Sequence, residues 1–305
     1  MAAADDNTEL INKILRLKEQ RNAVILSHNY QRPEVQDIGD FVGDSLELSR
    51  KAAETEAAVI VFCGVHFMAE TASILSPDKT VLLPDGESGC PMADMITADA
   101  LVKKKQEMPG VHVVCYVNSS AAVKAESEVC CTSANAVRVV ESVGPGEILF
   151  VPDQYLGQYV STQTRRPMVL WPGFCPTHLK IRSDDIILLK QKYPGSVALV
   201  HPECPPEVTA VGDHVLSTGG MLKFAGQTDA KILIIATEVG ILHRLQKENP
   251  GKTFIPANAK ALCPNMKKIT LEKILWALED MQPEIRVPGD IRMRARTAVD
   301  RMLAA

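Results

Sequence analysis

The stretch SHNYQRPEVQDIGDFVGDSLELS (residues 27–49) decides the fold, because the chain repeats its pattern twice more. The segments CYVNSSAAVKAESEVCCTSANAV (residues 115–137) and VHPECPPEVTAVGDHVLSTGGML (residues 200–222) align with it without gaps. Each segment follows an apolar run that is typical of a buried strand. Self-similarity of this kind indicates one structural unit present three times.

Two polar or aromatic residues, separated by one position, follow the apolar run in every copy. They are His28 and Tyr30, Tyr116 and Asn118, and His201 and Glu203. Residues i and i+2 of an extended segment point to the same side, so each pair faces one direction. A hydroxyl residue comes 17 positions after the first member of each pair, and these residues are Ser45, Ser133 and Thr218.

A cysteine followed by proline also recurs at one equivalent position of every copy, while Cys204-Pro205 lies outside this pattern. The three pairs are Cys90-Pro91, Cys175-Pro176 and Cys263-Pro264, at steps of 85 and 88 residues. The step from His28 to Tyr116 is 88 residues, and that from Tyr116 to His201 is 85. Because the two sets share one register, chance adjacency is a poor explanation. Proline restricts the residue before it to extended conformations, which suits a loop that presents a thiolate.

Apolar strands alternate with helical patterns through each copy, as in residues 57–63 and 66–75. Continuous apolar strands joined by helices favour parallel sheets that are covered on both faces, with right-handed crossovers. We therefore predict an α/β fold of three similar three-layer αβα domains with small parallel sheets around a pseudo-threefold axis. The predicted domains are residues 1–108 with an N-terminal helix, 109–192, and 193–305 with a C-terminal helix.

Composition indicates a globular protein: 46% of the 305 residues are hydrophobic and 23% are charged. The net charge is -4 and the longest basic run has only three residues (103–105), which argues against a nucleic-acid partner. The longest apolar runs (57–65 and 231–242) fall short of the ~20 residues that span a bilayer. The first residues lack the basic region of a signal peptide, and the eight cysteines do not resemble a disulfide framework. We expect a cytoplasmic protein that binds neither nucleic acid nor a membrane.

Three Cys-Pro loops around a threefold axis could bring three thiolates to one point, because ligands of parallel sheets bind beyond the carboxyl ends of the strands. Three thiolates suit a 4Fe-4S cluster with one iron open to substrate, or a catalytic zinc. The cluster is favoured, because catalytic zinc normally draws on histidine or carboxylate. Zinc stays an alternative, since Cys175-x-x-His178 and His201-x-x-Cys204 have plausible ligand spacings.

The hydroxyl residues precede helical patterns, so each is a candidate helix N-cap. A helix start also offers free amide groups and partial positive charge to an anion, which suits a substrate with carboxylates or phosphate. We predict the likeliest phosphate contact at Ser217 and Thr218, where Gly219 and Gly220 permit close backbone approach.

Among the three polar pairs, Glu203 is the only carboxylate and the natural general base. Tyr30 and Tyr116 are candidate proton carriers, and His28 and His201 are candidate carboxylate binders.

At these residues the chain resembles the quinolinate synthase family of de novo NAD biosynthesis. The resemblance covers nearly the whole chain and includes GCPMADM, WPGFCPTH, HPECPPEV, LSTGGM and CPNMK. It implies three α/β domains in a triangle and a 4Fe-4S cluster on Cys90, Cys175 and Cys263. It also implies a transferase that condenses iminoaspartate with dihydroxyacetone phosphate to quinolinate, phosphate and water, with the enzyme that supplies iminoaspartate as a candidate partner.

The resemblance further implies a set of substrate-binding residues, together with Tyr30 as a residue of the chemistry. The substrate-binding set is His28, Ser45, Tyr116, Asn118, Ser133, His201, Glu203 and Thr218.

Two other classes compete with this interpretation. An iron–sulfur reductase of the hydroxymethylbutenyl diphosphate reductase type also places three α/β domains around a three-cysteine cluster, but it needs an electron donor and a diphosphate site. A non-catalytic binding protein joined by a structural zinc predicts a stable, colourless metal site.

Overall fold

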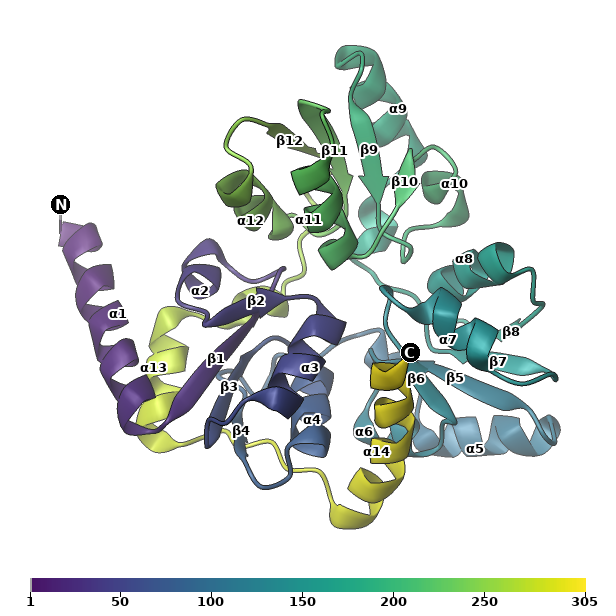
Figure 1. Cartoon of the computed structure of the whole chain (residues 1–305), viewed down its shortest axis with the longest axis horizontal. Coiled ribbons are helices and arrows are strands. Elements are labelled where there is room, and N and C mark those ends of the chain that lie inside the picture. The colour runs from purple at the N-terminus through teal and green to yellow at the C-terminus, as the bar shows by residue number, and fades with distance from the viewer. Residues whose placement is uncertain (1) are drawn as a thin grey trace.

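Three four-stranded sheets form three lobes around a common centre in the computed structural model, which describes the backbone of residues 2–305 and the side chains from residue 7 onward (Figure 1). All strands are parallel, and the three sheets share one strand order, β2-β1-β3-β4, β6-β5-β7-β8 and β10-β9-β11-β12. We call the parts that contain these sheets unit 1, unit 2 and unit 3.

The strands of unit 1 are β1 (Ala23–His28), β2 (Phe41–Gly43), β3 (Val59–Cys63) and β4 (Thr80–Leu82). Those of unit 2 are β5 (His112–Tyr116), β6 (Val129–Cys131), β7 (Ile148–Val151) and β8 (Val169–Leu170). Those of unit 3 are β9 (Val197–Val200), β10 (His214–Val215), β11 (Ile232–Ala236) and β12 (Thr253–Pro256). The repeat in the sequence therefore corresponds to a repeat of the whole sheet.

Helices connect the strands and cover both faces of each sheet (Figure 1). The helices of unit 1 are α1 (Ala2–Gln20), α2 (Pro33–Asp37), α3 (Ser45–Glu54) and α4 (His66–Leu75). Those of unit 2 are α5 (Ala98–Glu107), α6 (Ala121–Ala125), α7 (Ala136–Ser142) and α8 (Gln154–Thr164). Those of unit 3 are α9 (Ser183–Lys192), α10 (Pro206–Thr209), α11 (Thr218–Gln227) and α12 (Ile241–Glu248).

The central strands are apolar along their length because both of their faces are covered. Every residue of β3 and of β7 is buried. This is the pattern expected of parallel strands between two helical layers. The predicted three-layer αβα class is confirmed. None of the helices described in residues 2–305 combines the length and the apolar character of a membrane span.

Each Cys-Pro loop connects one unit to the next. A short 3-10 turn follows each of these cysteines: η1 (Ala93–Met95), η2 (His178–Lys180) and η3 (Met266–Lys268). The helix after η1 is α5 of unit 2, and the helix after η2 is α9, which packs on β9 and β11 of unit 3. The helix after η3 is α13 (Leu271–Asp280), and it packs on α1 and β3 of unit 1. The third loop thus returns the chain to the first unit and closes the ring.

The C-terminal helix α14 (Gly289–Ala304) packs against α4 of unit 1 and against α6 and β6 of unit 2. Its buried face consists of Ala295, Ala298, Val299 and Met302. Asn135 donates a hydrogen bond from Nδ2 to the carbonyl oxygen of Met302 at 2.9 Å. The helix therefore stabilises the contact between units 1 and 2, while the predicted domain boundaries stay a prediction.

We expect Met302→Ala to lower the free energy of unfolding by roughly 2–5 kcal/mol, because it leaves a cavity in the α14 contact. Met293 of the same helix is 69% exposed, so Met293→Ala should change stability by less than about 0.5 kcal/mol. Urea denaturation of both variants measures the difference. Equal stability of the two variants would contradict the role given to α14.

Candidate active site and metal centre

A cavity of about 200 Å³ lies where the three units meet, beyond the carboxyl ends of their strands. Every residue predicted to act in catalysis, substrate binding or the three-cysteine site, apart from Ser217, lines this cavity. The polar pairs follow β1, β5 and β9, which are equivalent strands of the three sheets. The arrangement predicted from the repeat is thus present.

The three cysteines of the repeated Cys-Pro pairs have the same surroundings. Backbone N–H groups two and three residues later interact with each sulfur and act to lower its pKa. These groups belong to Met92 and Ala93 for Cys90, Thr177 and His178 for Cys175, and Asn265 and Met266 for Cys263.

Burial outweighs these interactions and raises the pKa of all three thiols, that of Cys90 to about 12. Nearby thiols add to the effect, since Cys263 raises the pKa of Cys90, and Cys90 raises that of Cys175. A bound metal deprotonates a coordinating thiol, because its charge replaces the missing solvation of the thiolate. Three partly buried thiols with matching backbone donors at one cavity therefore fit a thiophilic metal group such as a 4Fe-4S cluster.

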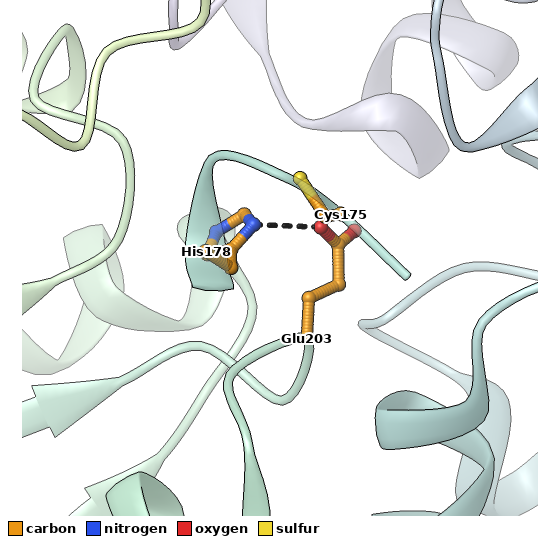
Figure 2. A group of neighbouring side chains, drawn as sticks. All are labelled: Cys175, His178 and Glu203. Atoms are coloured by element: carbon orange, nitrogen blue, oxygen red, sulfur yellow. Dashed lines mark ion pairs between the residues drawn. The ribbon is translucent and has the colours of Figure 1, made fainter. Parts of the chain in front are cut away.

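A second group of possible ligands shares Cys175. The sulfur of Cys175, the ring of His178 and the carboxylate of Glu203 turn toward one another, with ligand atoms within 4.8 Å (Figure 2). The other zinc-like spacing, His201-x-x-Cys204, has no such geometry. The Cys204 sulfur instead lies 3.6 Å from the carbonyl oxygen of Ala236, outside the cavity lining.

A chain of polar contacts crosses the cavity floor and joins the units. The Tyr116 hydroxyl donates a hydrogen bond to Oε1 of Glu203, whose Oε2 forms a 2.7 Å ion pair with Nδ1 of His178. On the other side of the ring, His178 Nε2 lies 2.8 Å from Oγ1 of Thr237. The same Thr237 oxygen lies 2.5 Å from the hydroxyl of Tyr30. Tyrosines of units 1 and 2 are thus connected through residues that follow the second Cys-Pro loop.

The pKa values of Glu203 and the two tyrosines show which of these groups accepts a proton and which can donate one. Burial alone would raise the pKa of Glu203, but His178, His201 and the Tyr116 hydroxyl favour the carboxylate and lower it overall. Burial raises the pKa of Tyr30 and Tyr116, and the charge of Glu203 raises both further. Glu203 is therefore an ionised acceptor between two protonated tyrosines.

His28 and His201 have one tautomer and one charge state. The backbone N–H of Tyr30 donates to Nδ1 of His28 at 3.2 Å, and that of Glu203 donates to Nδ1 of His201 at 3.3 Å. The proton of each neutral ring is therefore on Nε2. Burial lowers the pKa of both rings to about 3, helped by Lys267 at His28 and by His178 at His201. Both histidines can donate from Nε2 at neutral pH, which suits a carboxylate acceptor.

The hydroxyl residues predicted as N-caps are not the caps, and that part of the prediction is wrong. Asp44 caps α3 by accepting from the backbone N–H groups of residues 46 and 47 at 3.0 Å, and Ser217 caps α11 by accepting from Gly220 at 3.2 Å. Asn135 precedes α7 without a side-chain cap. The true caps lie one residue before Ser45 and Thr218, so neither of these hydroxyls is used as a cap. The Thr218 hydroxyl instead accepts a hydrogen bond from Nδ2 of Asn29 at 3.1 Å. Ser217 is occupied by its cap, and its role in binding phosphate stays a prediction.

Sequence reasoning missed Thr237 and Glu238, and considered His178 only as a zinc ligand. Glu238 is fully buried, accepts from the backbone N–H of Cys263 at 3.0 Å and pairs with Lys267 at 3.1 Å. It thereby holds the third Cys-Pro loop in place. A signal existed, because Glu238 follows β11 as Asp153 follows β7, 85 residues earlier.

The fold and site together define a three-lobed α/β protein with three equivalent cysteines and titratable polar groups in one central cavity. The family model of the quinolinate synthetase A protein (NadA) matches residues 12–304. A quinolinate synthase from Dehalococcoides mccartyi is 58% identical over 296 residues, which cover 97% of this chain and 98% of the relative. Quinolinate synthases from Geotalea uraniireducens and Methanoregula boonei are 55% identical over 296 residues and 53% identical over 300 residues. These matches cover 97% of both chains for the first, and 98% of this chain and 99% of the relative for the second. The chain belongs to the quinolinate synthase family, whose members are enzymes of NAD biosynthesis.

The neutral state of His28 predicts a pH dependence of stability. The unfolded chain takes up a proton near pH 6.5, but the folded ring does so only near pH 3. Above pH 6.5 the ring is neutral in both the folded and the unfolded chain, so it does not lower the free energy of unfolding. As the pH falls from 6.5 toward 3, only the unfolded chain takes up the proton, and His28 lowers the free energy of unfolding progressively. The His28→Gln variant keeps a hydrogen-bond donor without this titration.

Urea unfolding at several pH values should show a shallower loss of stability for His28→Gln than for the unmodified protein over that range. Equal slopes for the two proteins would show that His28 titrates alike in the folded and unfolded states.

Proposed function

We propose that the protein is a transferase that condenses iminoaspartate (iminosuccinate) with dihydroxyacetone phosphate to quinolinate, phosphate and water, on a 4Fe-4S cluster held by Cys90, Cys175 and Cys263. The supporting observation is that these cysteines occupy one position in three equivalent loops around one cavity, with the same backbone donors at each sulfur. The relatives are quinolinate synthases, and their names agree with this reaction. When bound, such a cluster supplies an iron without a protein ligand, which acts as a Lewis acid toward a substrate oxygen.

Neutral rings and helix starts would bind the anionic groups of the two substrates. His28 and His201 donate from Nε2 and carry no charge that a change of pH near neutrality would alter. The first residues of α3 and α11, Ser45 and Thr218, bring hydroxyl groups and helix N-termini to the cavity wall. The helix dipole favours carboxylate or phosphate at such positions, where Asp44 and Ser217 already cap part of the backbone N–H groups. Asn118 and Ser133 line the same wall from unit 2 and complete the proposed substrate contacts.

Glu203 would take protons from the condensing substrates, and Tyr116 would return them. The carboxylate is ionised, and the Tyr116 hydroxyl that touches it is protonated. His178 fixes the second carboxylate oxygen, so Glu203 faces the cavity in one orientation. Tyr30 is a second proton donor, positioned by Thr237. Enclosure of these groups also limits the water that would hydrolyse an imine.

Family membership favours this reaction over that of the reductase considered above. The acid–base residues in the cavity favour an enzyme over a binding protein with structural zinc. We place the reaction in the cytoplasm, because all eight cysteines are free thiols, as a reducing compartment requires. An enzyme that produces iminoaspartate is the proposed partner, because direct transfer between the two enzymes would leave the unstable imine less time to hydrolyse in water.

Anaerobic purification followed by iron, sulfide and zinc analysis tests the cofactor, and addition of iminoaspartate with dihydroxyacetone phosphate tests the reaction. We expect a brown protein with iron and sulfide in equal amounts that forms quinolinate. A protein with a full complement of cluster that forms no quinolinate from these substrates would refute the proposed function.

Replacement of any one cluster cysteine by alanine should lower the bound iron and sulfide strongly and abolish quinolinate formation. The matched control is Cys204→Ala, because Cys204 also precedes a proline but lies outside the cavity lining. The control should keep its iron. Iron loss in Cys204→Ala as large as in Cys90→Ala would refute the assignment of the ligands.

Glu203→Gln should leave iron and sulfide content unchanged and lower the turnover rate by roughly 100-fold or more, because general-base groups contribute about 10²–10⁴-fold. The amide keeps the shape of the side chain but cannot accept a proton. Near-normal turnover in this variant would refute the role of Glu203 as base.

A further inference from the structure

We propose that the protein, when free of its cluster, binds one thiophilic divalent cation of the zinc type at Cys175, His178 and Glu203. This site differs from the three-cysteine site because it uses only one of those cysteines. It brings together a sulfur, a ring nitrogen and a carboxylate oxygen, the kinds of atom that catalytic zinc takes from proteins, and leaves a fourth position open.

The distances fit such an ion. The three ligand atoms lie within 4.8 Å of one another, and those of a tetrahedral zinc site lie about 3–4 Å apart, since each is about 2.0–2.3 Å from the metal. Small side-chain rotations therefore suffice to form the site. Among the described side chains, Cys90 and Cys263 do not join this group. The cation needs no change of backbone.

His178 is already oriented as metal-binding histidines are. Its Nε2 lies 2.8 Å from the hydroxyl of Thr237, and its Nδ1 faces Glu203 Oε2 at 2.7 Å. An outer hydrogen bond of this kind fixes the ring and its tautomer in metal sites. Thr237 itself is held by Tyr30 at 2.5 Å. A ring nitrogen and a carboxylate oxygen at this distance can share either a hydrogen or a metal ion.

The charge balance also favours a divalent ion. His178 and Glu203 are almost fully buried, with side-chain exposures of 2% and 4%. A thiolate and a carboxylate carry two negative charges, so one divalent cation makes the buried site neutral, whereas unpaired buried charges are costly.

The consequence for the enzyme rests on the proposed function. Cys175 cannot serve this cation and the cluster together, and Glu203 cannot act as base while it is a ligand. Bound zinc would therefore prevent cluster assembly and would also prevent Glu203 from accepting a proton.

Titration of the cluster-free full chain with Co²⁺, which reports thiolate ligation and tetrahedral geometry in its absorption spectrum, tests the site. We expect one equivalent to bind with a sulfur-to-cobalt charge-transfer band and to be displaced by Zn²⁺. Cys175→Ala should lose this band, while the matched controls Cys90→Ala and Cys263→Ala should keep it. Thr237→Val should weaken Co²⁺ binding by roughly 10–100-fold, as loss of an outer-shell partner does, and Thr237→Ser should restore it.

The isosteric variant Glu203→Gln and the variant His178→Ala should each bind Co²⁺ at least 10-fold more weakly, with circular dichroism showing that both fold. Loss of the band in Cys90→Ala as in Cys175→Ala, or unchanged binding in both Glu203→Gln and His178→Ala, would overturn the proposal.

A separate arm keeps this proposal distinct from the proposed function. Prior loading with Zn²⁺ should block reconstitution of the cluster from iron and sulfide. If the zinc-free chain also fails to assemble a cluster while the cobalt spectrum behaves as expected, the cluster assignment fails and the cation site stands. If zinc-loaded protein reconstitutes fully and retains its zinc, the shared use of Cys175 is refuted.

Discussion

Contact between the end of unit 3 and the start of unit 1 is what holds the central site together. After the third Cys-Pro loop, α13 packs on α1 and β3, and the segment that follows it pairs with the edge of the first sheet. The backbone N–H of Leu83 donates to Pro283 at 3.1 Å, and that of Ile285 donates to Val81 at 2.8 Å. Without this closure, the polar residues at the carboxyl ends of the strands would lie apart in three separate sheets. With it, the carboxyl ends of all three sheets face one cavity, and Cys263 lies there with its two counterparts, Cys90 and Cys175.

The cavity gathers groups that are costly to bury. Three thiols with raised pKa values, an ionised Glu203 and two uncharged histidines lie together with little solvent. Such groups are tolerated when they are paired or bound to a metal, and otherwise they lower stability. His178 compensates one side of Glu203 and Tyr116 the other, so the acid–base residues are paired before substrate arrives. The three thiols interact with backbone donors, and this environment is consistent with the metal group proposed for them.

The repeat in the sequence made the architecture and most of the cavity predictable, because residues at equal register must occupy equal positions in equal units. Cys263 illustrates this, since it has no neighbouring cysteine and found its partners only by register. The repeat could not reveal features that break it. Thr237 bonds to Tyr30 of another unit, and no pattern within one unit encodes a contact between two. The N-caps failed for a related reason: Asp44 and Ser217 compete with the adjacent Ser45 and Thr218, and backbone geometry, not residue type, decides which one caps.

Mössbauer spectroscopy of protein reconstituted anaerobically with ⁵⁷Fe tests most directly the claim that three units supply one cysteine each to a cluster with an open iron. The account predicts a 4Fe-4S signal in which one iron site alone changes its parameters when quinolinate is added. A signal in which all iron sites respond alike or none responds, or a mononuclear iron signal, would contradict it.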